Sequence, residues 1–128
     1  MQTIHPVLRY EDAHAAIDFL EAAFGGQRVQ VHENDDGAVV HAELRLAGEV
    51  VLISSTGAGN PVFDQGAGRS VVYVALDDVD ALHQRALEAG ADILMAPTDQ
   101  DYGSRDFAAR DPEGNIWSFG TYRPAESS

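Results

Sequence analysis

The feature that most constrains this fold is a set of cap and turn residues that recurs 66 positions along the chain. Asp12 and Asp78 each precede an amphipathic helical segment, and Gly48 and Gly114 each lie in a turn between two strand-like segments. Both pairs have the same separation (78 − 12 = 66 and 114 − 48 = 66). A fixed period of this kind is typical of an internal duplication. We therefore expect two copies of one structural unit.

Each copy is predicted to contain a strand, a helix and three further strands. Asp12 can cap a helix over residues 13–24 that ends at Gly25, because aspartate accepts hydrogen bonds from the free N–H groups of the first turn. Asp78 and Gly90 have the same roles in the second copy, although the two glycines are 65 residues apart (90 − 25 = 65). The predicted strands cover 4–10, 29–31, 39–46 and 50–54, then 70–76, 93–95 and two runs that flank the turn 111–115.

This pattern predicts an α+β fold in which two tandem βαβββ modules form a curved, β-rich cavity with the helices outside. A length of 128 residues suits one domain, with module 1 over about 3–54, a connector over 55–69 and module 2 over about 70–123. The connector is rich in glycine and is expected to be a flexible linker. Phe63 leaves open a second role for it, as a lid on the cavity.

The composition excludes several classes of function. The chain has 8 arginines, no lysine and 21 Asp and Glu, for a net charge of −13, so nucleic acid is not an expected partner. This acidity would attract a cationic ligand, or it simply keeps the protein in solution. The absence of cysteine excludes disulfides and thiolate metal sites. Without an apolar run of about 20 residues or a signal peptide, we expect no membrane partner and a cytoplasmic location.

The alternation of side chains along a strand predicts which residues face the cavity. In the run 39–46, the apolar set that includes Leu44 would face the helix, which leaves His41 and Glu43 on the cavity side. Shifting this assignment by 66 places Arg105 and Phe107 in the cavity and Trp117 on the helix side. The residues predicted to face the cavity include His5, Val7, Arg9, His41, Glu43, Leu52, Ser54, Val71, Tyr73, Arg105, Phe107 and Ser118.

Several segments in this order resemble the vicinal oxygen chelate superfamily, which includes glyoxalase I, extradiol dioxygenases and bleomycin-resistance proteins. The resemblance rests on His5 to Asp12 with the following helix, on His41-Ala42-Glu43-Leu44 before Gly48, and on Gly103 to Trp117 with its Asp-Pro-Glu-Gly-Asn turn. It covers nearly the whole chain. It implies paired modules around a small-molecule cavity, and a homodimer as the expected assembly.

In the enzymes that this chain resembles, a divalent metal is held at the first and last strands of each module. The corresponding positions here are His5, Leu52, Val71 and Ser118, of which only His5 is a metal-ligand type. The expected cofactor is therefore none. A rebuilt metal site with His5, His41 and Glu43 is the alternative, since all three are predicted to face the cavity.

The leading functional hypothesis is a metal-free, small-molecule-binding protein similar to the bleomycin-resistance branch, which would sequester an antibiotic or a metabolite. The predicted ligand-binding residues are His5, His41, Glu43, Tyr73, Tyr102, Arg105, Phe107 and Ser118. Arg105 would either clamp a ligand carboxylate or pair with a neighbouring acid such as Asp106. The alternatives are a metal-dependent lyase, isomerase or dioxygenase acting on vicinal oxygens, and metal-free acid–base chemistry with His41 or Glu43 as the base.

Overall fold

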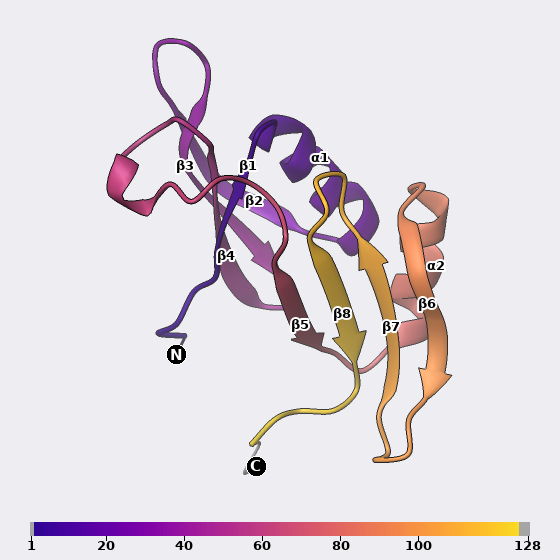
Figure 1. Cartoon of the computed structure of the whole chain (residues 1–128). Helices are drawn as coiled ribbons and strands as arrows, with labels where there is room; N and C mark the ends of the chain where they lie inside the picture. Colours follow the sequence, from indigo (N-terminus) through magenta and orange to yellow (C-terminus); the bar gives the residue numbers. More distant parts are fainter. Residues whose placement is uncertain (1, 126–128) are drawn as a thin grey trace.

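The computed structural model describes residues 2–125 and contains the βαβββ unit twice (Figure 1). The first module comprises β1 (Val7–Tyr10), α1 (Ala13–Phe24), β2 (Gln27–Glu33), β3 (Val39–Leu46) and β4 (Glu49–Ser55). The connector holds a single short helix, η1 (Pro61–Phe63). The second module comprises β5 (Val71–Ala75), α2 (Val79–Glu88), β6 (Asp92–Asp99), β7 (Arg105–Arg110) and β8 (Ile116–Gly120). The predicted α+β fold with tandem modules is confirmed.

Each module forms its own four-stranded sheet with the same topology. The strand orders are β1-β4-β3-β2 and β5-β8-β7-β6, with β1 parallel to β4, β5 parallel to β8 and the other neighbours antiparallel. A parallel pair cannot be joined by a tight turn, so the crossover segment contains the helix. Each helix covers one face of its sheet and leaves the other face open.

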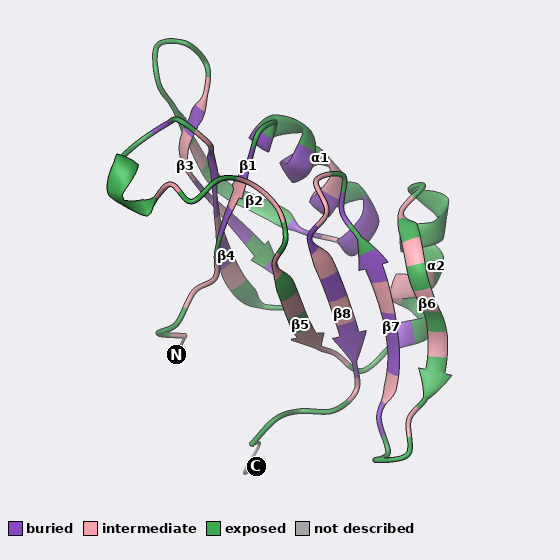
Figure 2. Cartoon of the chain, viewed as in Figure 1, coloured by how far each residue is buried: buried purple, intermediate pink, exposed green. Residues whose placement is uncertain are grey.

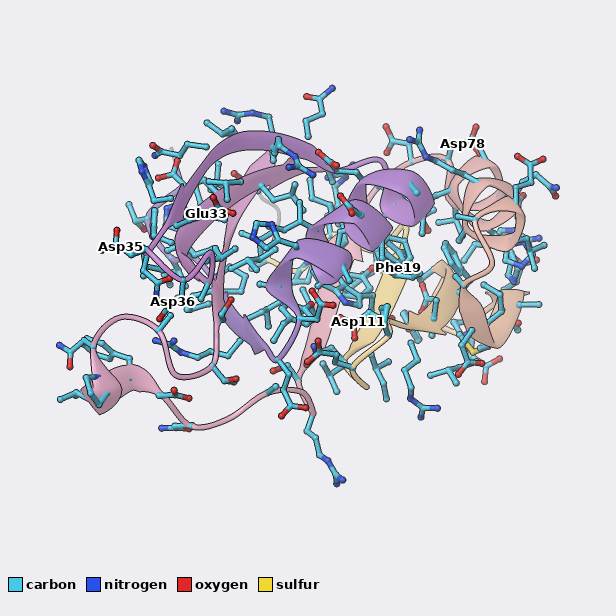
Figure 3. The ribbon with its side chains drawn as sticks, turned by 90° about the horizontal axis from the view of Figure 1, so that it is seen from above. Phe19, Glu33, Asp35, Asp36, Asp78 and Asp111 are labelled. Carbon is cyan, nitrogen blue, oxygen red and sulfur yellow. The ribbon has the colours of Figure 1, made fainter. Side chains whose placement is uncertain are left out.

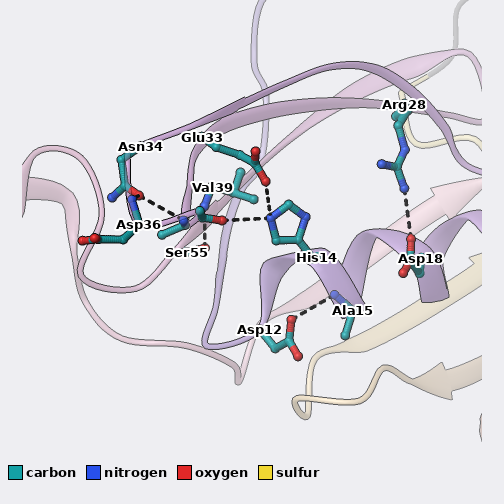
Figure 4. Close-up of polar contacts among 12 residues, drawn as sticks. Asp12, His14, Ala15, Asp18, Arg28, Glu33, Asn34, Asp36, Val39 and Ser55 are labelled. Atoms are coloured by element: carbon teal, nitrogen blue, oxygen red, sulfur yellow. Dashed lines mark hydrogen bonds and ion pairs between the residues drawn. The ribbon is translucent and has the colours of Figure 1, made fainter.

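The ends of α1 are set by the residues that the sequence singles out. Asp12 Oδ1 accepts the N–H of Ala15 at 3.1 Å (Figure 4), and Gly25 takes the left-handed conformation with φ of 76°. The buried residues recur at helical spacing and form one stripe against the sheet. They are Ala13, Ala16, Ile17, Leu20, Ala23 and Phe24.

Helix α2 repeats this design with a smaller apolar face. Asp78 Oδ1 accepts the N–H of Ala81 at 3.0 Å, whereas only Val79 and Ala86 of the helix are buried. Arg85 of α2 instead donates hydrogen bonds to the carbonyl oxygens of Ala22 at 3.0 Å and Glu21 at 3.1 Å in α1. Because the last carbonyls of a helix lack partners within it, this arginine satisfies α1 while joining the two helices.

Aromatic packing joins the two modules on the helix side. The ring of Phe24, at the end of α1, lies 5.6 Å from Trp117 and 4.8 Å from Phe119 of β8, measured between centroids. Trp117 and Phe119 are fully buried, and no residue of β8 is exposed (Figure 2). The prediction that these two residues face the helices rather than the cavity is confirmed.

The Asp-Pro-Glu-Gly-Asn turn is the polar part of the same junction (Figure 3). The buried Asp111 carboxylate accepts the hydroxyl of Tyr10 at 2.6 Å and the indole N–H of Trp117 at 3.1 Å. Glu113 accepts the backbone N–H groups of Glu11 at 2.6 Å and Asp12 at 2.8 Å, where α1 begins. Burial, with the Asp111 carboxylate beside it, raises the pKa of Tyr10 above its usual range. The turn of the second module thus binds the first module through Asp111 and Glu113.

The two modules differ in the register of one hairpin. In the first sheet Glu43 is opposite Leu52, whereas in the second Ala108 is opposite Ser118, so β4 and β8 correspond with an offset of 66 (118 − 52) and β3 and β7 with an offset of 65 (108 − 43). Because side chains alternate, a shift by one residue moves every residue of a strand to the other face. The side chains of β7 therefore point to the opposite face from the one predicted with an offset of 66.

No helix among residues 2–125 has the length and apolar character needed to cross a bilayer.

Candidate functional site

A pocket of about 740 Å³ lies between the open face of the first sheet and the connector. Its floor comes from β1, β3 and β4, and its roof from the connector, which runs beside the first sheet (Figure 1). The residues of the floor are Val7, Arg9, Val40, His41, Leu52, Ile53 and Ser54. The predicted cavity-side placement is confirmed for five of them, namely Val7, Arg9, His41, Leu52 and Ser54.

Arg9 attaches the connector to the sheet. Its Nη1 donates to the carbonyl oxygens of Ser55 and Ala58, both at 3.0 Å, and its Nε donates to the carbonyl of Phe63 at 3.2 Å. One side chain of β1 thereby fixes both the start of the connector and its short helix. No signal in the sequence identifies these acceptors, because all three are main-chain groups.

Side chains within the connector fix its own shape. The Asp64 carboxylate accepts the N–H groups of Gly57 at 2.6 Å and Gly66 at 3.1 Å, and Asn60 accepts the N–H of Val62 at 3.0 Å. These backbone hydrogen bonds, from Gly57 first and then Gly66, lower the pKa of Asp64. The connector is thus tied to itself and to Arg9 and forms the roof of a pocket, while its flexibility stays a prediction.

Apolar side chains face the space under this roof. Phe63 is 66% exposed and Val62 77% exposed in the connector, and Val7 is 57% exposed on β1. All three line the pocket together with Leu52. Exposed apolar groups around a concave site are the usual walls for a small organic ligand.

His41 and Glu43 lie together on the open face of β3, as predicted. His41 Nε2 donates to Glu43 Oε2 at 3.1 Å, and the amide of Gln30 donates to the same oxygen at 2.6 Å. The bond from His41, followed by that from Gln30, lowers the pKa of Glu43. A lowered pKa makes a carboxylate a weaker base, which counts against Glu43 as a general base.

The positions that would hold a metal in the enzymes that this sequence resembles do not fit one here. The Nδ1 of His5 donates to the carbonyl oxygen of Val50 at 2.9 Å, and His5 does not line the pocket. Leu52 and Val71 offer no donor atom, and Ser118 lies opposite Ala108 on another sheet. Among residues 2–125, no three His, Cys, Asp or Glu side chains lie close enough to share a metal ion.

Tyr73 and Tyr102 belong to a polar cluster on the second module. The buried Asp106 accepts hydrogen bonds from the hydroxyls of Tyr102, at 2.9 Å, and Ser104. Tyr73 donates to the carbonyl oxygen of Tyr122 at 2.6 Å. The pKa of Tyr102 is raised, first by its hydrogen bond to the Asp106 carboxylate. This cluster attaches the segment after β8 to the second sheet, away from the pocket.

The expected placement of Arg105 and Phe107 in the cavity is wrong, because of the shifted register of β7. Phe107 is fully buried and packs on His83 of α2 at 5.4 Å and on Phe119 at 4.9 Å, measured between ring centroids. Arg105 forms ion pairs with Asp80 at 3.1 Å and Asp99 at 3.0 Å. Its role is structural pairing, although with other acids than those suggested by the sequence.

Comparisons with known proteins agree with this architecture. Residues 2–119 match the model of the Glyoxalase/Bleomycin resistance protein/Dioxygenase superfamily. An uncharacterised protein of Mycobacterium bovis is 34% identical over 123 residues, which are 91% of this chain and 81% of that protein.

Solved structures share the fold over nearly the whole chain. TioX from Micromonospora sp. ML1 is 31% identical and superposes with a TM-score of 0.78 over 98% of this chain and all of its own. A glyoxalase I variant from Zea mays, 22% identical, has a TM-score of 0.73 over 94% of this chain and 45% of its own, a likeness in fold alone. By the extent of the match, the chain belongs to the glyoxalase/bleomycin resistance protein/dioxygenase superfamily.

Proposed function

We propose that this protein binds and sequesters a small organic molecule, an antibiotic or a metabolite, in the pocket between the first sheet and the connector. The observation that carries the proposal is the pocket of about 740 Å³, whose roof is tied down by Arg9 and whose apolar side chains point into open space. A volume of this size suits a drug-sized ligand. The side chains at the metal positions favour binding without a metal over metal-dependent chemistry.

The test is to fill the pocket by enlarging one of its side chains. Leu52→Trp would occupy its floor, and Ser118→Trp at the equivalent position of the second sheet is the matched control (118 − 52 = 66). Binding of a neutral aromatic probe, 2-naphthamide, is measured by isothermal titration calorimetry. We expect Leu52→Trp to abolish binding and Ser118→Trp to leave it unchanged. The reverse result would place the site on the second module.

A metal-dependent lyase, isomerase or dioxygenase is the competing function. Elemental analysis of the purified protein distinguishes the two. Near-stoichiometric Fe, Mn, Ni or Zn that disappears in His5→Ala would reject sequestration without a metal. We expect less than about one tenth of an equivalent in both proteins, because neighbouring positions lack donor atoms.

We also propose a homodimer, in which a second copy covers the open face of the second sheet. Support comes from Val71, which is 71% exposed on β5, and from Tyr73 on the same strand. Light scattering after gel filtration should give twice the chain mass of 13.7 kDa. Val71→Asp should give the monomer, and Val29→Asp, at another exposed valine, should not. A monomeric wild-type protein would reject this assembly.

The cytoplasmic location stays a prediction.

A further inference from the structure

The pocket has a charge opposite to that of the molecule. The chain carries a net charge of −13, yet no Asp or Glu is among the pocket-lining residues in the described part of the chain. Two arginines line it, Arg9 from β1 and Arg69 from the end of the connector. Carboxylates are therefore absent from the one concave site where the sheet and the connector meet.

The guanidinium of Arg9 is only partly used by the protein. Its Nε and Nη1 donate to three carbonyl oxygens, and its Nη2 has no partner among residues 2–125. These carbonyl oxygens accept hydrogen bonds, but they carry no formal charge that would neutralise the guanidinium. Asp64 interacts electrostatically with Arg9, although its oxygens accept hydrogen bonds from the N–H groups of Gly57 and Gly66 and none from Arg9. Arg9 thus keeps the two N–H groups of Nη2 for a ligand, and no carboxylate among residues 2–125 is hydrogen-bonded to it.

Arg69 is the second cationic group, and it has no hydrogen bond or ion pair with any other residue between 2 and 125. Its φ of 69° lies in the left-handed region, which residues other than glycine seldom adopt. Such backbone conformations persist only where the surrounding structure enforces them, and they are frequent at ligand sites. Here the preceding Gly68 passes so close to the carbonyl of Glu113 that a Cβ would lie 2.5 Å from that oxygen. The connector thereby directs Arg69 to the rim of the pocket.

The other arginines show that this arrangement is selective. Four of the eight pair with carboxylates, namely Arg28, Arg105, Arg110 and Arg123. Arg85 joins the two helices through carbonyl oxygens, and Arg45 is exposed at the far end of β3. Arg9 and Arg69 are the arginines among residues 2–125 that line the pocket, and neither forms an ion pair with a carboxylate there.

We propose that the ligand of this pocket is a small organic anion, with a carboxylate or a similar oxyanion held between Arg9 and Arg69. Its apolar body would lie against Val7, Leu52 and Phe63. Guanidinium groups suit the planar geometry of a carboxylate. The acidic residues elsewhere on the surface are screened beyond about 8 Å at physiological salt, so the groups at the pocket determine the preference. This inference rests on the proposed function and specifies its ligand, with the opposite sign to that expected from net charge.

The experiment compares three probes of one shape on the full chain. Calorimetry measures 2-naphthoate, neutral 2-naphthamide and cationic 2-naphthylmethylammonium against the wild type, Arg69→Gln and Arg45→Gln. We expect naphthoate to bind most tightly. Arg69→Gln should weaken naphthoate about three- to tenfold, as for a partly exposed charged hydrogen bond, and leave naphthamide unchanged. Arg45→Gln, which removes an equal charge outside the pocket, should change neither.

Each of the other possible results would overturn a specific part of the proposal. If the ammonium or the amide binds as tightly as naphthoate while Leu52→Trp still blocks it, the pocket is right and the anion is wrong. Equal weakening by Arg69→Gln and Arg45→Gln would assign the preference to overall charge and overturn the site. If naphthoate binding survives Leu52→Trp, or naphthoate does not bind at millimolar concentration, the anion proposal is overturned as well. Only the first of these two results also counts against the pocket as the binding site.

Discussion

The two modules share a topology but differ in what covers their open faces. The first sheet is roofed by the connector, and its face carries Arg9 and His41 around a pocket. On the second sheet the position equivalent to Arg9 is Ala75 (75 − 9 = 66), and the polar groups are Asp106 and its hydroxyl partners. A duplicated scaffold can therefore place a ligand site on one copy and use the other copy for internal attachment.

The hairpin turns explain part of this divergence. The first module joins β3 to β4 through Ala47 and Gly48, whereas the second joins β7 to β8 through the five residues 111–115. The longer turn brings Asp111 and Glu113 onto the first module and shifts the pairing of β7 by one residue. The longer turn thus accounts both for the contacts between the modules and for the opposite orientation of the side chains on β7.

The largest effect is expected from Asp111→Ala, which would break the junction that distinguishes the second turn. The change leaves the buried donors of Tyr10 and Trp117 without an acceptor. Each buried unsatisfied group costs about 1–3 kcal/mol, so we expect a loss of about 3–5 kcal/mol in unfolding free energy, measured by urea denaturation. Asp101→Ala, in an exposed loop, is the control. A loss below about 1 kcal/mol would show that the turn is dispensable.

Gly120→Ala tests how far the second sheet depends on its polar cluster. A Cβ at this position would meet Asp106 Oδ1 and lie 2.6 Å from the hydroxyl of Tyr73. Overpacking of this kind costs about 1–3 kcal/mol, seen as a lower midpoint in urea. The equivalent position in the first sheet is Ser54 (120 − 54 = 66), where Ser54→Ala should change stability by about 0.5 kcal/mol or less. Equal losses at both positions would contradict the difference between the modules.

Arg9→Met should release the roof of the first module while keeping the length of the side chain. Loss of three partly exposed hydrogen bonds to the connector would lower stability by about 1–2 kcal/mol. We expect faster cleavage within residues 57–68 in limited proteolysis followed by mass spectrometry. Ala75→Met, at the equivalent position, is the control. Unchanged cleavage of the connector in Arg9→Met would show that Arg9 does not hold it.

The smallest effect concerns pH. Burial and Asp111 raise the pKa of folded Tyr10 above its value in the unfolded chain, so its contribution is complete below about pH 10. As the pH rises further, the unfolded state loses its proton first and stability falls. Tyr10→Phe should cost about 1 kcal/mol at pH 7 and reduce this alkaline loss, in urea titrations at pH 8–11. Tyr122→Phe should preserve it, and an identical pH profile in both variants would contradict the assignment.

Much of the fold was predictable because its signals are local. Asp12, Asp78 and Gly25 determine helix ends within a few residues, and the stripe of α1 follows from helical spacing. The placement of Val7, Arg9 and His41 was predictable from alternation along the strands of the first module. Arg105 and Phe107 were misplaced because the register of a hairpin depends on hydrogen bonding across the turn, which the repeat of 66 does not determine. Phe63 had indicated a possible lid, but its attachment was not predictable, because Arg9 binds main-chain carbonyls that any residue could offer.

The contact between Arg85 and the end of α1 and the hydrogen bonds of Asp111 hold the two modules together independently of the connector. None of these bonds involves residues 56–68. The halves are thus complementary surfaces that would recognise each other even as separate polypeptides. A gene split in this stretch should therefore still yield a folded complex from two coexpressed fragments, held by the contacts of Arg85 and Asp111.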